Sequence, residues 1–253
     1  MITIKTREEI EIMAEAGRRL ARILKTLKSE ANVGVRGKEL DTMARELIVR
    51  GGDQPAFLGY QPGRMEKAFP ATICFSVNDV VVHGIPGDEI IKDGDVVKLD
   101  IGLIHKGFYT DTALTVGVGN ITEKARRLIA ATEESLRRGI AAAKVGNTVG
   151  DIGAAVEGYI ESQGFSIVTS LSGHGIGREL HEDPHVFNFG RPGKGEELRE
   201  GMVIAIEPMV GAGKAKTIQQ KDDSFAMADG SLSAHFEHTV AITKNGPRVL
   251  TAR

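Results

Sequence analysis

An internal repeat restricts the fold of this 253-residue sequence more than any other feature. Two segments that lie 112 residues apart share their apolar positions and their glycine breaks. The matching residues are Ala31, Val33, Gly34, Leu40, Ala44, Leu47, Ile48 and Gly52 in the first segment and Ala143, Val145, Gly146, Ile152, Val156, Tyr159, Ile160 and Gly164 in the second. Two unrelated amphipathic helix pairs would explain the matching glycines poorly, so the repeat predicts a duplicated α/β unit.

Each copy of the repeat contains two predicted helices followed by a β-rich segment with acidic residues. Apolar residues recur every three or four positions over 10–27 and 40–48, and again over 128–140 and 152–160. This spacing is typical of amphipathic helices. Two such halves, about residues 1–120 and 121–253, would place the polar residues of their sheets around one shared cleft. We therefore expect one α+β domain over residues 1–253.

Composition excludes several classes of protein. Charge is nearly balanced, with 32 basic and 34 acidic residues, so nothing indicates binding to nucleic acid or to an anionic membrane. The single Cys74 excludes an internal disulfide and fits a reducing compartment. No apolar run has the length of a signal peptide core or of a membrane span. These features predict a soluble, cytoplasmic protein.

Two β-rich runs between Asp95 and Thr112 predict a hairpin around the turn 105–107. If the turn is centred between residues 105 and 106, Asp100 lies directly opposite Asp111, with Cβ atoms about 4.5–5.5 Å apart. A one-residue bulge would shift this register. The other face of the hairpin is apolar and consists of Val97, Leu99, Ile101 and Leu103.

Two opposed carboxylates repel each other, so the predicted pair needs a proton, a nearby cation or a metal ion. A solvated outer face of the sheet, with Lys98 as a surface partner, explains the hairpin equally well when it is considered alone. The second half of the chain has to decide between these interpretations.

The second half supplies single acidic residues within apolar strands. Glu207 follows the run 202–206, and Glu237 begins the run 237–242. An unpaired carboxylate in such a strand costs several kcal/mol to bury. An edge strand is the alternative for Glu207, because the following proline tolerates an edge. His174 lies among three glycines that provide little packing cover, which favours a ligand over a core histidine.

Residues 181–185 match the zinc-protease pattern H-E-x-x-H letter by letter. That pattern binds zinc only on a continuous helix, which brings both histidines to one face. Pro184 lacks the N–H that a helix needs and disfavours the helical conformation of Asp183. We therefore interpret this match as accidental.

Five residues then remain as candidate metal ligands. They are Asp100, Asp111, His174, Glu207 and Glu237. Four carboxylates balance the charge of two divalent cations, and oxygen-rich sites with one imidazole suit Mn, Fe, Co or Zn. Two such ions about 3.5–4 Å apart can lower the pKa of a shared water molecule and polarise a carbonyl. The chemistry that this set implies is hydrolysis.

The arrangement of these residues resembles the five-ligand pattern of the methionine aminopeptidases. The segments that carry the resemblance are the hairpin aspartates, Gly173–Gly177, Ile206–Pro208, Phe236–Thr239 and the histidine motif Asn78–Pro86. The resemblance extends over essentially the whole chain. It implies the pita-bread fold, a pseudo-twofold pair of α/β halves whose antiparallel sheet encloses a site for two metal ions, in agreement with the repeat.

The resemblance also implies a role for each residue. Asp100 would bind one metal ion, Asp111 and Glu237 would bridge both, and His174 and Glu207 would complete the other. Glu207 would also handle the proton of the attacking water. His83 and His181 would contact the substrate backbone and the developing oxyanion.

Spacing within the family pattern indicates the subtype. Only 29 residues separate Glu207 from Glu237, which leaves no room for the helical insertion of type 2 enzymes, so a short, bacterial-style type 1 enzyme is expected. Residues 65–67 resemble a short insertion near the substrate pocket. The expected lining of that apolar pocket is Tyr60, Phe69, Cys74, Leu180 and Phe225, each of which could equally be an ordinary core residue.

Two other functions stay open at this point. One is a proline-specific exopeptidase of the same fold, and the other is a relative that only binds and does not catalyse. The resemblance implies nascent polypeptide N-termini as substrates, with the ribosome as a further partner, and a monomeric enzyme.

Overall fold

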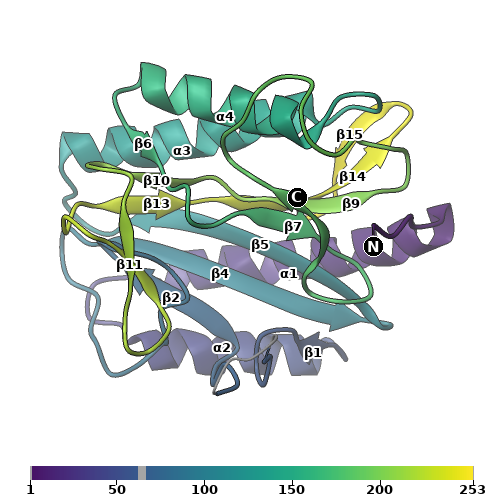
Figure 1. Cartoon of the computed structure of the whole chain (residues 1–253). Helices are drawn as coiled ribbons and strands as arrows, with labels where there is room; N and C mark the ends of the chain where they lie inside the picture. Colours follow the sequence, from purple (N-terminus) through teal and green to yellow (C-terminus); the bar gives the residue numbers. More distant parts are fainter. Residues whose placement is uncertain (1, 62–66, 253) are drawn as a thin grey trace.

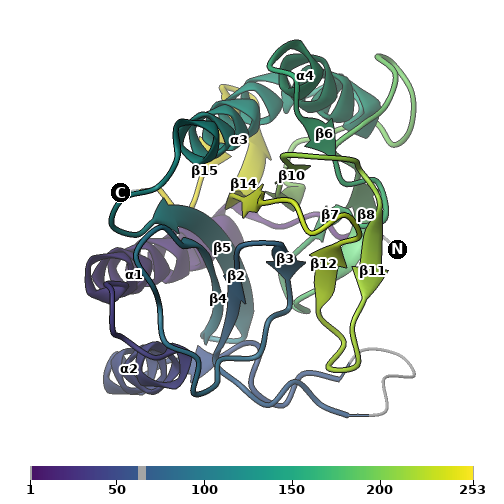
Figure 2. The ribbon, with the colours of Figure 1, turned by 90° about the vertical axis from the view of Figure 1, so that its left-hand side faces the viewer.

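The computed structural model describes residues 2–61 and 67–252 (Figure 1). Its four helices are α1 (Arg7–Glu30), α2 (Gly37–Arg50), α3 (Glu123–Ala142) and α4 (Val149–Ser162). Figure 2 shows both helix pairs on the outside of a strongly curved antiparallel sheet, with the short strands β3, β11 and β12 across its inner side. Met65 and Glu66 of the expected insertion lie outside the described residues.

The strands are short except for one long hairpin. They are β1 (Gln54–Pro55), β2 (Ile73–Val77), β3 (Val80–Val82), β4 (Val96–His105), β5 (Phe108–Gly117), β6 (Ser166–Ile167), β7 (Gly173–Gly175), β8 (Glu182–Val186), β9 (Val203–Ile206), β10 (Met209–Gly211), β11 (Thr217–Gln219), β12 (Phe225–Met227), β13 (Ser233–His235), β14 (Glu237–Thr243) and β15 (Gly246–Val249). Mixed helices and antiparallel strands confirm the predicted α+β class.

The helix pairs follow the sequence repeat: α1 and α3 end at equivalent positions, Glu30 and Ala142, and the second helices match at both ends. Adding 112 to the bounds of α2, residues 37 and 50, gives 149 and 162, which are the bounds of α4. Both helices begin with a carboxylate that accepts a hydrogen bond from the backbone N–H three residues earlier. The bonds are Arg36 N to Glu39 Oε2 (2.9 Å) and Thr148 N to Asp151 Oδ2 (2.8 Å). Such caps satisfy an N–H that the helix itself leaves unpaired.

A nine-stranded sheet joins the two halves. Its main path runs β1-β4-β5-β14-β9-β7-β8, with β2 added to β4 and β15 added to β14. The junction is β5 against β14, where Ala113 pairs with Glu237. Val97, Leu99, Ile101 and Leu103 face α1 and α2 and are fully buried, as predicted for the apolar face of the hairpin. No helix within 2–61 and 67–252 is long and apolar enough to cross a membrane.

The predicted register of the hairpin is wrong. His105 pairs with Phe108, so the turn is centred between Lys106 and Gly107, and Asp100 faces Ala113 instead of Asp111. Both turn residues have positive φ, 49° and 81°, as a type I′ turn requires. Asp111 pairs with Gly102, two residues from Asp100 on the strand. The two carboxylates are therefore diagonal neighbours on the same face of the sheet.

The alternative of a solvated outer face is also wrong. Lys98, offered as a surface partner, is 1% exposed, and Asp111 is 4% exposed. The Lys98 ammonium group donates to the carbonyl oxygen of Asn78 (2.8 Å) and contacts no carboxylate within hydrogen-bond distance. The face that carries the aspartates therefore lies inside the molecule, where the second half covers it.

Candidate active site

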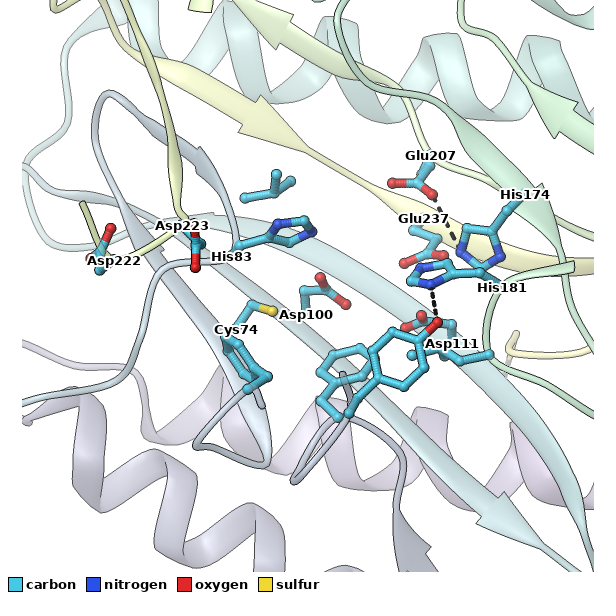
Figure 3. Close-up of a pocket in the computed structure, with 15 residues that line it drawn as sticks. Cys74, His83, Asp100, Asp111, His174, His181, Glu207, Asp222, Asp223 and Glu237 are labelled. Atoms are coloured by element: carbon cyan, nitrogen blue, oxygen red, sulfur yellow. Dashed lines mark hydrogen bonds and ion pairs between the residues drawn. The ribbon is translucent and has the colours of Figure 1, made fainter. Parts of the chain in front are cut away.

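Five neighbouring strands each bring one candidate ligand to the same pocket (Figure 3). The sheet order β4-β5-β14-β9-β7 delivers, in turn, Asp100, Asp111, Glu237, Glu207 and His174. Glu237 is the first residue of β14, and Glu207 directly follows β9. Because adjacent strands lie about 4.8 Å apart, one inward-facing residue on each strand suffices to build a compact cluster.

The centre of this cluster is tight. One ligand atom from each of Asp111, His174 and Glu237 lies within 4.8 Å of the other two. Glu207 approaches them from the side, with its Oε1 3.6 Å from His174 Nε2. Asp100 stands at the other side, next to Asp111. Three buried carboxylate oxygens, on Asp100, Asp111 and Glu237, have no hydrogen-bond partner among the described residues.

Burial raises the pKa of all four carboxyl groups. Removal from water is the largest cause at each of them, and mutual repulsion adds to it at Asp111 and Glu237. The pKa of Asp100 rises to about 6 and that of Glu207 to about 7, while those of Asp111 and Glu237 rise further above their usual values. No Lys or Arg of the described chain lines the pocket. Unpartnered oxygens, converging acids and missing cations together fit a divalent metal site.

Local geometry aims His174 at the cluster. Its Nδ1 lies 2.8 Å from the carbonyl oxygen of Gly175, which can only accept, so Nδ1 carries the proton. The other nitrogen, Nε2, points to Glu207 and is the one that a neutral ring would offer to a metal ion. This tautomer is the one that a metal-binding imidazole needs. Close backbone contacts surround the residue, because a Cβ on Gly175 would lie 2.1 Å from the Asp183 carbonyl oxygen.

Two more histidines flank the cluster, one from each half of the chain. His83 follows β3 and has a positive φ of 61°, a conformation that is uncommon outside glycine. His181 packs edge-on against the His174 ring at 4.3 Å between centroids, and its Nδ1 shares a 2.6 Å hydrogen bond with the Tyr60 hydroxyl. Desolvation lowers the pKa of His83 to about 4 and that of His181 to about 3, so both rings are neutral at pH 7.

The apolar end of the pocket agrees with four of the five expected lining residues. Tyr60, Phe69, Cys74 and Leu180 line it, together with Phe57 and Val82, which the sequence did not single out. Phe225 does not line the pocket. It pairs with Val82 across β12 and β3 and packs edge-on beside the His83 ring at 5.9 Å. Asp222 and Asp223, from the loop before it, line the pocket instead.

His235 is a further residue of the site that sequence reasoning missed. It is 1% exposed, and its Nε2 lies 3.5 Å from Glu207 Oε2. The sequence did contain an indication of this position. His235 precedes Glu237 by two residues in an extended segment, so both side chains point to the same side. The H-E-x-x-H match, in contrast, is accidental as predicted. Residues 182–186 form β8, so the two histidines are separated by about 13 Å of extended chain.

The geometry therefore defines a metal-dependent hydrolase with a deep acidic centre and an apolar subsite. Residues 11–244 match the model of metallopeptidase family M24. A methionine aminopeptidase of Clostridium perfringens is 48% identical to the chain, with 99% of each chain covered. The crystal structure of a methionine aminopeptidase from Thermotoga maritima superposes with a TM-score of 0.96 at 39% identity, with both chains fully covered.

The chain belongs to metallopeptidase family M24 and, within it, to the methionine aminopeptidases. The pita-bread fold that the sequence predicted is confirmed. A prolidase from Pyrococcus furiosus is more distant, with a TM-score of 0.79 and 28% identity, and the match covers 65% of that chain.

Proposed function

We propose that this enzyme removes the N-terminal methionine from polypeptides whose second residue is small. The observation that carries the proposal is the cluster of Asp111, His174 and Glu237, with ligand atoms within 4.8 Å of one another and no Lys or Arg of residues 2–61 and 67–252 in the pocket lining. The identity of the relatives supports the same activity.

The five clustered residues would hold two divalent metal ions, drawn from Co, Mn, Fe and Zn. Asp111 and Glu237 stand at the centre and suit bridging positions, with Asp100 on one side and His174 with Glu207 on the other. Ions at such a site lower the pKa of a water molecule and polarise the carbonyl of the scissile peptide bond. The number of ions and their identity are part of this proposal.

The chain's own residues supply the remaining chemistry. Glu207 takes the proton of the attacking water, because its carboxylate approaches the cluster from the side and has a second oxygen, Oε2, that faces away from His174. Neutral His83 and His181 contact the substrate backbone and the oxyanion from opposite sides. The Tyr60 hydroxyl fixes the His181 ring through their 2.6 Å hydrogen bond.

The substrate side chain enters the apolar end of the pocket. Tyr60, Phe69, Cys74 and Leu180 surround a narrow space that suits the unbranched thioether of methionine. Desolvation keeps the pKa of Cys74 well above its ordinary value, so its thiol stays neutral and behaves as an apolar wall. The second residue lies near His83 and the glycine-rich segment 173–177, where a large side chain would clash.

A panel of peptides tests the proposal. With Co²⁺ or Mn²⁺ added to chelator-treated enzyme, we expect fast methionine release from Met-Ala and Met-Gly peptides. Met-Lys and Met-Leu peptides should react slowly, and N-acetylated peptides should not react. Residues similar to methionine should be released slowly, because one methylene changes the rate by about 10–200-fold. Full turnover without metal would refute the metal site.

The same panel decides between the two other functions. Preferential cleavage of Xaa-Pro peptides, whatever the first residue, would indicate the proline-specific exopeptidase. Tight peptide binding without cleavage at any metal concentration would indicate a binding protein. The natural substrates in this proposal are nascent protein N-termini, met at the ribosome in the cytoplasm by a monomeric enzyme.

A further inference from the structure

The side chain of His235 is buried next to the carboxylates of Glu207 and Asp100. Both of its ring nitrogens lack a hydrogen bond to any described residue, and the residue is 1% exposed. In folded proteins, more than about 90% of buried polar groups are hydrogen-bonded, and exceptions need a reason. An aromatic or aliphatic residue would fill this space without that cost, so packing alone does not account for a histidine here.

The backbone holds His235 firmly in place. Its N–H donates to Thr115 Oγ1 (2.9 Å), and the Thr115 hydroxyl donates to its carbonyl oxygen (2.6 Å). On the other side, His235 pairs with Met209 in the ladder between β13 and β10. These bonds fix the backbone of His235 and therefore the direction in which its imidazole points.

That direction leads to Glu207. Nε2 of His235 is 3.5 Å from Glu207 Oε2, while Nε2 of His174 is 3.6 Å from the other oxygen, Oε1. The Glu207 carboxylate thus lies between two imidazoles that come from different sheets. His174 already donates through Nδ1, and its Nε2 is the nitrogen that would bind a metal ion. His235 is the ring that remains available to donate to Glu207.

We propose that His235 is a positioning residue, which donates a hydrogen bond from Nε2–H to Glu207 Oε2. This bond leaves Oε1 on the side of His174, where both side chains would be available to hold a metal ion. The inference rests on the proposed metal site and adds a residue outside the five ligands. Partners of this kind orient carboxylate ligands, and their loss typically weakens metal binding or activity by about 10–100-fold.

Three variants separate donation from packing. His235→Phe keeps a buried ring but has no donor, whereas His235→Gln keeps an amide N–H near the position of Nε2. His238→Phe is the matched control, because His238 is three residues away, is largely buried, and bonds Thr251 Oγ1 at 2.9 Å without lining the pocket. Mn²⁺ dissociation constants are measured by titration calorimetry on metal-stripped protein, and kcat and KM are measured on a Met-Ala peptide.

We expect Mn²⁺ to bind about 10–100-fold more weakly to His235→Phe and within about threefold of wild type to His235→Gln and His238→Phe. Wild-type affinity in His235→Phe would overturn the proposal. Equal weakening in His235→Phe and His235→Gln would overturn the donor role. If wild-type protein binds Mn²⁺ but does not release methionine, the proposed function fails while the affinity comparison still stands.

A measurement on the unmodified protein covers the case in which His235→Phe does not fold. Nitrogen-15 chemical shifts of the Zn²⁺-loaded enzyme identify which ring nitrogen of each histidine carries the proton. We expect the Nε2–H tautomer for His235, with the Nε2–H group hydrogen-bonded to a carboxylate. The Nδ1–H tautomer would overturn the proposal, because Nε2 could then not donate to Glu207.

Discussion

The two halves of the chain share their helix pairs but differ in how they connect the strands that carry the ligands. In the first half, β4 and β5 are joined by the two-residue turn at Lys106 and Gly107. In the second half, residues 207–236 separate β9 from β14 and contain β10 to β13. Both strand pairs lie side by side at the centre of the sheet, in the order β4-β5-β14-β9.

This difference indicates how a repeated fold acquires a specific site. The helices cover the outer face of the sheet and contribute nothing to the pocket lining. The long connection of the second half folds over the inner face and brings Asp222, Asp223 and His235 to the pocket. The repeated frame therefore places one carboxylate on each central strand, and the connection that is not repeated shapes the surroundings of the cluster.

The largest expected effect tests whether both halves are needed at the metal site. Asp111→Asn and Glu237→Gln each remove one central carboxylate, from β5 and β14 respectively. We expect each variant to lose metal and activity together, to background level, since loss of an outer partner alone costs about 10–100-fold. Metal content by atomic absorption and circular dichroism check the result. A folded variant that retains activity would show that its half does not supply a bridging ligand.

The next effect compares the two flanking histidines. His83→Ala and His181→Ala should each lower kcat/KM by about 10²–10³-fold, the typical cost of one preorganised stabilising contact. Metal content should remain that of wild type, because neither residue belongs to the central cluster.

His185→Ala is the control for this pair. His185 lies on β8, four residues after His181, and lines the adjoining outer cavity but not the pocket of the ligand cluster, so we expect kinetics close to wild type. Loss of metal from His181→Ala would reopen the H-E-x-x-H match.

A third effect concerns Lys98, a buried lysine of the first half. Lys98 precedes Asp100 by two residues, and the corresponding position before Glu207 is Ala205. Burial lowers the pKa of Lys98 to about 7. Between pH 7 and 10.5 the unfolded chain then binds more protons than the folded one, so this group makes the free energy of unfolding rise with pH. Each pKa unit of difference corresponds to about 1.4 kcal/mol.

Lys98→Met should remove that part of the pH dependence. Urea unfolding of metal-free protein at pH 7 and pH 9.5 is expected to show a gain of a few kcal/mol from Lys98, measured as the difference between wild type and the variant. The raised carboxyl pKa values of the acidic cluster oppose this gain, but they do so alike in both proteins. Lys25→Met, an exposed lysine on α1, serves as the control and should keep the wild-type gain. Identical pH dependence in wild type and Lys98→Met would show that the ammonium group remains hydrated.

The parts of the fold that sequence predicted well are those with a regular period. Helical spacing located all four helices, and the glycine breaks gave their relative positions, because core contacts repeat along one face. The candidate ligands were found because they interrupt such regular patterns. A carboxylate such as Glu207 within an apolar strand conflicts with its surroundings, and such conflicts mark functional sites.

The rest depended on backbone conformation and long-range contacts. The register of the β4–β5 hairpin was missed because Lys106 adopts positive φ, which its residue type does not signal. Phe225 was expected in the pocket, yet a shift of register between β12 and β3 turns it beside His83. The spacing of His235 and Glu237 indicated a shared direction, but the contact of His235 with Glu207 depends on the pairing of β13 with β10, which lies far from any local pattern.

The smallest expected effect tests the equivalence of the helix pairs themselves. Gly34 and Gly146 occupy the same place in each linker, with φ of 94° and 86°, and each donates its N–H to a later carbonyl, of Ile91 (2.9 Å) and Leu198 (3.0 Å). A Cβ at either position would meet nothing within 4 Å. Replacement by alanine therefore costs only the backbone strain of positive φ, about 1–2 kcal/mol. We expect urea unfolding to give this loss for Gly34→Ala and Gly146→Ala alike. Gly158→Ala, in open space on α4, should instead stabilise the protein by about 0.5–1 kcal/mol. A cost confined to one linker would show that the two helix pairs are related in outline only, because equivalent backbone conformations must impose equivalent strain.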